Sequence, residues 1–275
     1  TDEFVRKIIE KESSKKIGEF GLGMNPEFLR EGNAIEDFTF PDRIVIGYED
    51  NETLSRLEIL YNSWNCDKLK VNTRTAEMIK YANNSILATQ ISMTNELANL
   101  VARLGGIDIE DVMRGVHKDK RWNPIINYKR INPEILSYLK AGCGFGGSCF
   151  PKDVKALNSL SKNLNLESLI LDSVLKINDN QPFEIINILK GYFDNLKNKS
   201  FLILGLSFKP NTDDVRDSIS LKVIDFLQKE KCNIFAHDPI AVKNAKKFIT
   251  NTKNIFFTKN WENELEKVDG ILILT

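Results

Sequence analysis

The stretch Phe201-Leu202-Ile203-Leu204-Gly205-Leu206 decides the fold of the last third of the chain. A short, unbroken apolar run closed by glycine is typical of a strand buried on both faces of a parallel sheet. It is followed by an amphipathic segment from Ser218 to Lys229 and by two more apolar runs, Asn233 to Ala236 and Gly270 to Leu274. This order predicts a βαβαβ half-sheet that binds its ligand at the carboxyl ends of the strands.

The segment before this half-sheet is predicted to be mostly helical. From Thr75 to Gly105-Gly106, apolar residues recur mainly at steps of three or four, which predicts one helix of about thirty residues. A helix of that length bridges two domains or packs against a partner subunit, so we expect a homodimer. Shorter helical patterns follow at Ile109 to Val116, Val154 to Leu164 and Ser168 to Asn178.

The first 64 residues predict a smaller α/β piece. They contain a charged amphipathic stretch from Glu3 to Lys16, expected strands at Ile17 to Met24 and Asp42 to Gly47, and helical spacing from Leu54 to Trp64. Two strands are too few to bury a parallel sheet, so we expect the chain to begin within a domain. The expected domains are residues 1–72, 73–180 and 181–275, the last also cut short.

Composition excludes several classes of protein. The 275 residues hold 38 Lys and Arg against 38 Asp and Glu, so no basic excess points to nucleic acid. No apolar run reaches the length of a membrane span or a signal peptide, which predicts a cytoplasmic protein that does not bind membranes. The four cysteines lack disulfide-framework spacing, and His117 and His237 lack metal-ligand spacing, so no metal site is expected.

The densest chemical signal is the run from Gly142 to Asp153, GCGFGGSCFPKD. Its glycines allow backbone amides to approach a ligand closely. Cys149 is followed by Lys152, whose ammonium can stabilise a thiolate, and by Asp153, whose carboxylate can orient water. The alternative is a small apolar cysteine in a glycine turn. The glycines and the two charged residues favour a nucleophile.

Three other strings accompany this run: NPEFLREG at residues 25–32, KYANN at 80–84 and FKPNTDDVR at 208–216. In this order the four strings resemble the nucleotide-sugar 6-dehydrogenases of the UDP-glucose/GDP-mannose dehydrogenase family. The resemblance implies an α/β fold with the tail of a Rossmann-like NAD-binding domain, a central long-helix dimerisation domain and a C-terminal Rossmann-like UDP-binding domain. It also implies NAD as cofactor, and it places most of the NAD-binding domain before Thr1.

The family oxidises a sugar CH2OH group to a carboxylate in two NAD-dependent steps. By resemblance, Cys149 is the nucleophile that holds the aldehyde as a thiohemiacetal and then as a thioester. Lys80 and Asn84, four apart on the long helix, stabilise the oxyanion. Asp153 positions or activates water, and Glu27 serves hydrolysis or proton transfer.

The resemblance also assigns binding residues. The substrate contacts it implies are Glu27, Phe28, Leu29, Arg30, Glu31, Lys80, Asn84, Arg130, Tyr138, Leu139, Lys140, Gly142, Gly146, Phe208 and Lys209. The cofactor contacts are Glu31, Cys149, Lys152 and Arg216, with Arg216 on the pyrophosphate. Arg130 departs from the family pattern, because Arg130-Ile131-Asn132 replaces Arg-Ile-Gly and the segment up to Lys140 is longer.

Each of these assignments has a plainer alternative. Lys80 can be a solvated cation, and Arg130 an ordinary surface arginine. Glu27 and Glu31 can lie in the first turn of a helix that begins after Pro26. Residues 209–214 can form a turn that caps a helix beginning near Asp214.

The substrate itself is left open. The motifs surround the oxidised carbon, so they fix the chemistry better than the nucleotide base. UDP-glucose is the leading substrate, with GDP-mannose and UDP-N-acetylmannosamine as alternatives. A non-catalytic fragment that binds nucleotide sugars and dimerises is the alternative from another class, and the chain alone is expected to be inactive.

Overall fold

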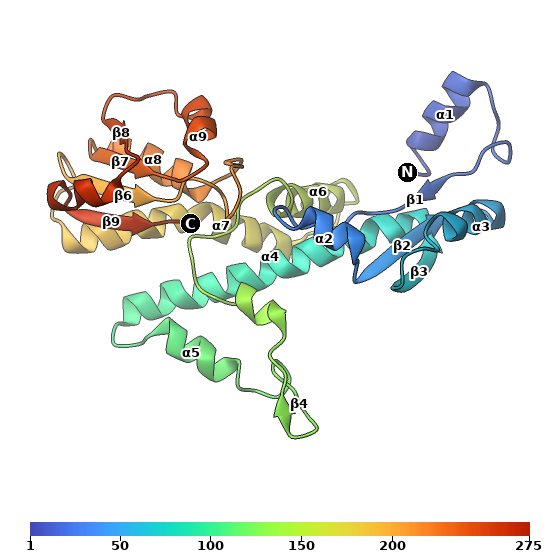
Figure 1. Cartoon of the computed structure of the whole chain (residues 1–275), viewed down its shortest axis with the longest axis horizontal. Helices are drawn as coiled ribbons and strands as arrows, with labels where there is room; N and C mark the ends of the chain where they lie inside the picture. The colour runs from blue at the N-terminus through green and yellow to red at the C-terminus, as the bar shows by residue number, and fades with distance from the viewer. The chain divides into compact units, whose positions relative to one another are not determined.

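The computed structural model describes residues 1–275, which form two compact units, Thr1–Asn83 and Asn84–Thr275. Helix α4 (Thr73–Leu104) belongs to both units (Figure 1). Each unit is α/β, as the sequence predicts, and each has its own sheet. None of the helices combines the length and the apolar character needed to cross a bilayer.

The first unit is built on a three-stranded sheet in the order β1-β2-β3. Strand β2 (Arg43–Tyr48) is central and carries the buried Ile44, Val45 and Ile46. It pairs in parallel with β3 (Asp67–Asn72) and antiparallel with β1 (Gly23–Met24). Helix α3 (Asn51–Leu60) connects the two parallel strands, so this part is a βαβ crossover.

Two sequence expectations for this unit need correction. Most of the strand expected from Ile17 to Met24 is absent, because glycines interrupt the run and only Gly23 and Met24 pair with β2. Strand β3 was not predicted, because its alternation of lysines with Leu69 and Val71 reads as a charged segment. Helix α1 (Val5–Ser13) lies within the expected amphipathic stretch.

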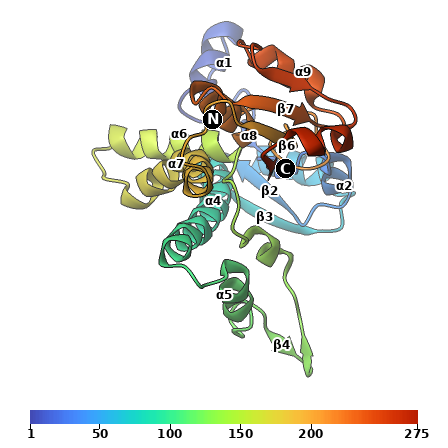
Figure 2. The same cartoon turned by 90° about the vertical axis from the view of Figure 1, so that its left-hand side faces the viewer.

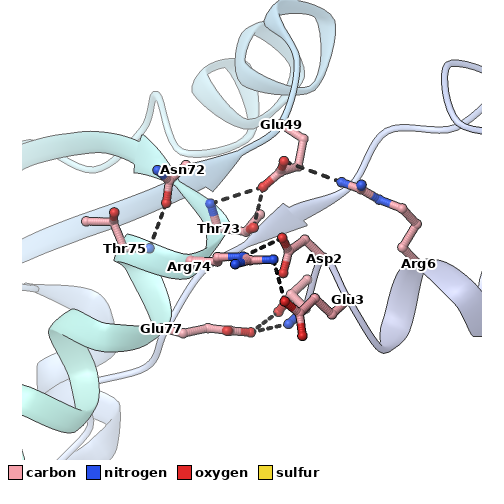
Figure 3. A network of polar contacts seen from close by, with 10 residues as sticks. Asp2, Glu3, Arg6, Glu49, Asn72, Thr73, Arg74, Thr75 and Glu77 are labelled. Atoms are coloured by element: carbon pink, nitrogen blue, oxygen red, sulfur yellow. Dashed lines mark hydrogen bonds and ion pairs between the residues drawn. The ribbon is translucent and has the colours of Figure 1, made fainter. Parts of the chain in front are cut away.

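Polar contacts fasten the start of the chain to the start of α4 (Figure 3). Arg74 pairs with Asp2 at 2.7 Å and with Glu3 at 2.5 Å. Glu49, just after β2, accepts hydrogen bonds from the backbone and hydroxyl of Thr73 and pairs with Arg6. The carboxyl ends of β2 and β3 are thereby tied to the first turn of the long helix.

The helical part of the second unit confirms most of the sequence expectations. Helix α4 is 32 residues long, and α5 (Ile109–Val116) has the expected bounds. Helix α6 spans Phe150–Asn163, and α7 spans Leu169–Tyr192, which is fourteen residues beyond the expected end. Figures 1 and 2 show α7 beside α4, where the Ser92 hydroxyl donates to the Val174 carbonyl at 3.3 Å.

A hairpin and a short 3-10 helix connect α5 to α6. The hairpin pairs β4 (Ile125–Ile126) with β5 (Lys129–Arg130) and projects away from α4 in both Figures 1 and 2. Its turn residues Asn127 and Tyr128 both have positive φ, as a tight hairpin turn requires. The 3-10 helix spans Glu134–Tyr138. The sequence patterns did not predict this hairpin, because each of its strands has only two residues.

The end of the chain forms a parallel sheet in the order β8-β7-β6-β9. Strand β6 (Ser200–Leu204) is central, with Phe201, Leu202 and Ile203 fully buried, as the sequence predicts. Its neighbours are β7 (Asn233–His237) and β9 (Gly270–Ile273), both expected. Strand β8 (Ile255–Phe257) and helix α9 (Val242–Phe248) were not predicted.

Helix α8 (Ile219–Lys229) crosses over from β6 to β7 as predicted. It also packs on α7, where the Phe183 and Phe226 ring centroids lie 4.1 Å apart. The capped helix expected near Asp214 therefore begins five residues later, with the Ser218 hydroxyl accepting from the Ser220 backbone. The core of this sheet includes Ile186 and Leu189 of α7, so the sheet and that helix share one continuous core.

Asp238, which follows β7, stabilises the carboxyl edge of this sheet. Its carboxylate accepts hydrogen bonds from the backbone N–H groups of Leu206, Ser207, Ile240 and Ala241 at 2.7–3.3 Å. Burial alone would raise the pKa of Asp238, but these four donors favour the charged form, and the pKa lies below its usual value. The stabilisation is therefore present at neutral pH and is lost as the pH falls below about 3.9, toward the lowered pKa.

We expect Asp238→Asn to lower the free energy of unfolding at pH 7 by about 1–3 kcal/mol, because an amide nitrogen then faces N–H donors. Urea denaturation at pH 7 and at about pH 3 measures this. The difference between the wild type and the variant should shrink at the lower pH, because the unfolded carboxyl is then largely protonated and the charged native form loses its advantage. A difference that is independent of pH would exclude the carboxylate as its cause.

Candidate active site

Cys149 stands at the start of helix α6 and is exposed. It occupies the N-cap position, and Pro151 follows in the first turn, where the missing proline N–H costs nothing. The Cys149 Sγ lies 3.7 Å from the Ser148 hydroxyl. An exposed thiol at the positive end of a fourteen-residue helix is accessible to an incoming electrophile.

Asp153 lies one turn into α6 and is completely buried. The Asn84 side-chain amide donates to its Oδ2 at 2.6 Å, and the Lys152 ammonium pairs with its Oδ1 at 2.6 Å. Its backbone N–H donates to the Cys149 carbonyl. The structure thus brings four predicted residues, Asn84, Cys149, Lys152 and Asp153, to one place. A buried carboxylate held by two donors is a fixed group rather than a mobile base.

The glycine loop before Cys149 packs against the segment that connects β6 to α8. The Gly147 N–H donates to the Arg216 carbonyl at 3.0 Å. A Cβ on Gly146 would lie 2.4 Å from the Asp217 carbonyl oxygen, and one on Gly147, where φ is +79°, would lie 2.6 Å from the Phe208 ring. These two glycines therefore allow contact between two protein segments, in addition to the expected approach of a ligand.

Amide side chains of two helices hold the other end of the loop. Asn95 on α4 accepts from the Gly142 N–H at 2.8 Å, and Gln181 on α7 donates to the Gly142 carbonyl at 3.0 Å. Asn178 on α7 binds both backbone groups of Phe145. The sequence reasoning missed these residues. For Asn178 and Gln181 the signal was a polar side chain at a position of α7 where helical periodicity predicts core.

The loop expected to close on the nucleotide is only partly exposed. Tyr138 ends the 3-10 helix and is half-buried, Leu139 is buried, and Lys140 is exposed. Gly142 has open space where its Cβ would be. Lys140 is thus the charged group that this segment presents to solvent.

Phe208, Lys209 and Arg216 lie on the loop after β6, at the carboxyl edge of the sheet. The Lys209 ammonium lies 5.6 Å from the centroid of the Phe208 ring. Arg216 forms a two-point ion pair with Asp214, whose pKa is lowered chiefly by that hydrogen-bonded contact. Open parallel sheets bind their ligands at this edge.

Arg130 lies apart from these groups, on the projecting hairpin. Its Nη1 donates to the carbonyls of Lys118 and Asn123, both at 3.0 Å. Asn123 also donates to the Asn132 side chain at 2.6 Å. Within the chain, Arg130 therefore fastens the base of the hairpin.

The first unit holds the remaining predicted catalytic residues, Glu27 and Lys80. They form an ion pair with each other, and Glu27 also accepts from the Leu29 N–H at 2.8 Å. The Lys80 side chain is 19% exposed, so it is not the fully solvated cation of the plainer alternative. No helix begins after Pro26; α2 (Ala34–Thr39) is the next one. The first-turn alternative for Glu27 and Glu31 is therefore wrong.

The residues around Glu27 are also fixed by local contacts. Phe28 packs under the guanidinium of Arg43, with its ring centroid 4.1 Å from Cζ. Arg30 forms a two-point ion pair with Asp37, while Leu29 is exposed and Glu31 opens the turn before α2. Charged and aromatic contacts thus fix this segment, which has no regular secondary structure.

Models of three domains of one family match this chain. The NAD-binding domain of the UDP-glucose/GDP-mannose dehydrogenase family matches residues 1–65, the central domain residues 74–180, and the UDP-binding domain residues 202–275. Almost the whole chain is therefore matched by parts of the same family.

Individual proteins of known name are similar to the chain over most of its length. The chain is 40% identical to a UDP-glucose 6-dehydrogenase of Rickettsia conorii over 258 residues, which is 93% of this chain and 56% of that protein. It is 38% identical to UDP-glucose 6-dehydrogenase YwqF of Bacillus subtilis over 275 residues, all of this chain and 59% of that protein. The chain thus spans little more than half the length of these relatives.

A solved structure of a similarly named protein has the same fold as this chain. A UDP-glucose dehydrogenase from Pyrobaculum islandicum superposes with a TM-score of 0.84 at 39% identity, covering 93% of this chain and 56% of that one. The glycine-cysteine run, the amide side chains of α4 and α7, and the parallel sheet thus occur together with a match to all three domain types. The chain belongs to the UDP-glucose/GDP-mannose dehydrogenase family.

Proposed function

We propose that the protein carrying this chain oxidises UDP-glucose to UDP-glucuronate with NAD, through a covalent intermediate on Cys149. One observation carries the proposal: the exposed thiol of Cys149 stands one helical turn from the buried Asp153, which holds Asn84 and Lys152. The relatives named UDP-glucose 6-dehydrogenase support the choice of substrate.

The thiol keeps the half-oxidised sugar from escaping. After the first oxidation, the Cys149 sulfur adds to the aldehyde carbon and forms a thiohemiacetal. Loss of hydride from that carbon gives a thioester, and water then displaces the thiolate to leave the carboxylate. NAD, when bound, would supply the hydride acceptor for each oxidation, so that one alcohol, one water and two NAD would yield one carboxylate, two NADH and three protons.

The polar groups stabilise charge and place water. Helix α4 carries Lys80 and Asn84 on one face, and both donors suit the oxyanion that develops on the sugar oxygen. Asp153 acts by orienting Asn84 and Lys152 and helps to position the water. Glu27, paired with Lys80, takes the proton from the alcohol or from water.

Charged groups suited to a dinucleotide are present. Arg216 presents a guanidinium whose side chain is 59% exposed, and a guanidinium binds pyrophosphate with two parallel hydrogen bonds. A pyrophosphate would compete with Asp214 for this group. We assign Arg216, Lys152, Glu31 and Cys149 to the cofactor side of the reaction.

We assign the remaining binding residues to the nucleotide sugar. Phe208 and Lys209 offer a ring and a cation at the carboxyl edge of the sheet, and Lys140 offers a second cation. We assign the sugar and phosphate contacts to these residues together with Phe28, Leu29, Arg30, Tyr138, Leu139, Gly142, Gly146 and Arg130.

Because four free cysteines include an exposed reactive one, we place the protein in the cytoplasm, which is reducing.

A panel of nucleotide sugars tests the substrate. NADH formation by the full-length gene product is followed with UDP-glucose, GDP-mannose and UDP-N-acetylmannosamine, each at the same concentration. We expect two NADH per UDP-glucose consumed. Turnover of GDP-mannose alone would overturn the UDP assignment. Binding of UDP-glucose without any NADH formation would show that the protein is a non-catalytic binding module.

We also propose a homodimer formed through α4. Along this helix Ile86, Met93 and Leu100 are spaced by seven and are each more than half exposed, and Leu104 continues the stripe. A seven-residue apolar repeat is the pattern of a helix that packs against another helix. Light scattering at micromolar concentration should give twice the 31.4 kDa of one chain. A monomer mass would contradict this.

A further inference from the structure

The loop that carries Cys149 has no secondary structure of its own between Gly142 and Ser148. Its backbone polar groups must therefore find partners elsewhere, because unpaired buried groups are costly. The partners at two loop residues, Gly142 and Phe145, are amide side chains from helices α4 and α7. We call Asn95, Asn99, Asn178 and Gln181 the amide clamp.

Asn178 makes the most specific contact in the amide clamp. Its Oδ1 accepts from the Phe145 N–H at 2.7 Å, and its Nδ2 donates to the Phe145 carbonyl at 2.9 Å. This two-point contact imitates the pairing of neighbouring strands and fixes both the position and the direction of the peptide. Gly144 leaves room for it, because a Cβ there would lie 2.6 Å from the Asn178 Oδ1.

Gln181 holds the loop one turn further along α7. Its Nε2 donates to the Gly142 carbonyl, and its Oε1 accepts from the Asn99 side chain at 3.1 Å. Asn95 accepts from the Gly142 N–H, so both backbone groups of Gly142 are bonded to amide side chains. Asn95, Asn178 and Gln181 are each at most 6% exposed. Buried, mutually bonded amides of this kind define a single backbone arrangement.

We propose that Asn178 and Gln181 are positioning residues that hold the Cys149 loop in the arrangement needed for covalent capture of the sugar. This inference rests on the proposed function. Neither residue is assigned any role by the family resemblance above. Both act through the loop backbone rather than on the substrate. Loss of the Asn178 contact with Phe145 should therefore weaken the placement of the thiol without removing an assigned substrate contact.

Three cysteines of this unit report on the loop without any substrate. Cys143 lies between the two clamped residues, is half-buried, and packs against the core of the sheet. Burial raises the pKa of its thiol, which further slows alkylation. Cys232 is fully buried and reports global unfolding, while Cys149 is exposed and serves as the reference.

The test is iodoacetamide labelling of the 275-residue chain, with each cysteine peptide quantified by mass spectrometry over time. Asn178→Asp keeps the size of the side chain and loses the donor to Phe145. We expect it to speed Cys143 labelling roughly tenfold, which corresponds to about 1.4 kcal/mol less free energy holding the loop closed. Cys232 should stay protected.

A second variant and a control keep the test decisive if Asn178→Asp folds poorly. Gln181→Glu removes the Nε2 donor to the Gly142 carbonyl and to the Asn99 Oδ1 but leaves the Asn178 contact with Phe145 in place, and we expect a smaller increase at Cys143. Asn187→Asp makes the same chemical change on an exposed part of α7, where Asn187 contacts only Glu184, and should leave all three rates unchanged. Unchanged Cys143 rates in both clamp variants, or equal increases at Cys143 and Cys232, would overturn the proposal.

Kinetics of the full-length gene product separate positioning from stability. With the loop loosened at Phe145 by Asn178→Asp, kcat should fall about tenfold while KM for the nucleotide sugar stays within about twofold, because no substrate contact is assigned to Phe145. A raised KM with unchanged kcat would assign the two residues to binding instead. Because labelling requires no turnover, its failure overturns the amide clamp alone, whereas absence of oxidation in the wild type overturns the proposed function.

Discussion

Cys149→Ser in the full-length gene product is expected to lower kcat for the complete oxidation on the order of 10³-fold or more, the scale of losing a nucleophile. A serine hydroxyl adds poorly to the aldehyde, and an ester formed on it expels an alkoxide, a poorer leaving group than a thiolate. The variant should therefore release aldehyde or accumulate an acylated enzyme. Stopped-time assays that measure NADH, aldehyde and carboxylate together distinguish these fates.

The matched control is Cys143→Ala, six residues earlier in the same loop. Cys143 is half-buried against the core, and the proposed mechanism assigns it no role. This variant should keep kcat within about twofold of the wild type, since only packing is changed. Wild-type flux through Cys149→Ser would remove that thiol from the mechanism, and equal losses in both variants would point to loop packing.

Gly146→Ala is expected to have the second largest effect. A Cβ at this position would lie 2.4 Å from the Asp217 backbone oxygen and 3.2 Å from the Phe208 Cβ. Backbone atoms cannot step aside as a flexible side chain can, so the loop must separate from the segment after β6. We expect a loss of about 1–3 kcal/mol in the free energy of unfolding, the range for overpacking.

Urea denaturation compares this variant with Gly142→Ala, in which the added methyl has no neighbour within 4 Å. The control should unfold within about 0.5 kcal/mol of the wild type. Activity of Gly146→Ala should fall as well, because the same displacement moves the start of α6 and Cys149. A Gly146→Ala midpoint equal to that of the control would show that the loop does not need this contact.

The sequence predicted the elements with strong periodic patterns. Helix α4 and strand β6 have long, regular apolar patterns, and both were placed correctly. Strand β3 was missed because it is an edge strand in which Lys68 and Lys70 alternate with Leu69 and Val71 and none of its residues is buried. The end of α7 was missed because Pro182 interrupts the pattern, although the helix continues through it to Tyr192.

The site was predictable only in part. Glycines, a cysteine and charged residues close together in sequence identify the loop around Cys149. The partners of that loop are distant in sequence, however, because Asn178 and Phe208 approach it only through the packing of α7 and β6. A single sequence contains the polar residue at a core position but does not say which backbone group it satisfies.

Mass spectrometry of the Cys149 peptide during turnover tests the central claim most directly. The full-length gene product is mixed with UDP-glucose and NAD, quenched in acid within the first turnovers, and digested without added thiol. We predict a sugar-acyl adduct on Cys149 and none on Cys143. Carboxylate product formed at the wild-type rate with unmodified Cys149 at every quench time would contradict the account.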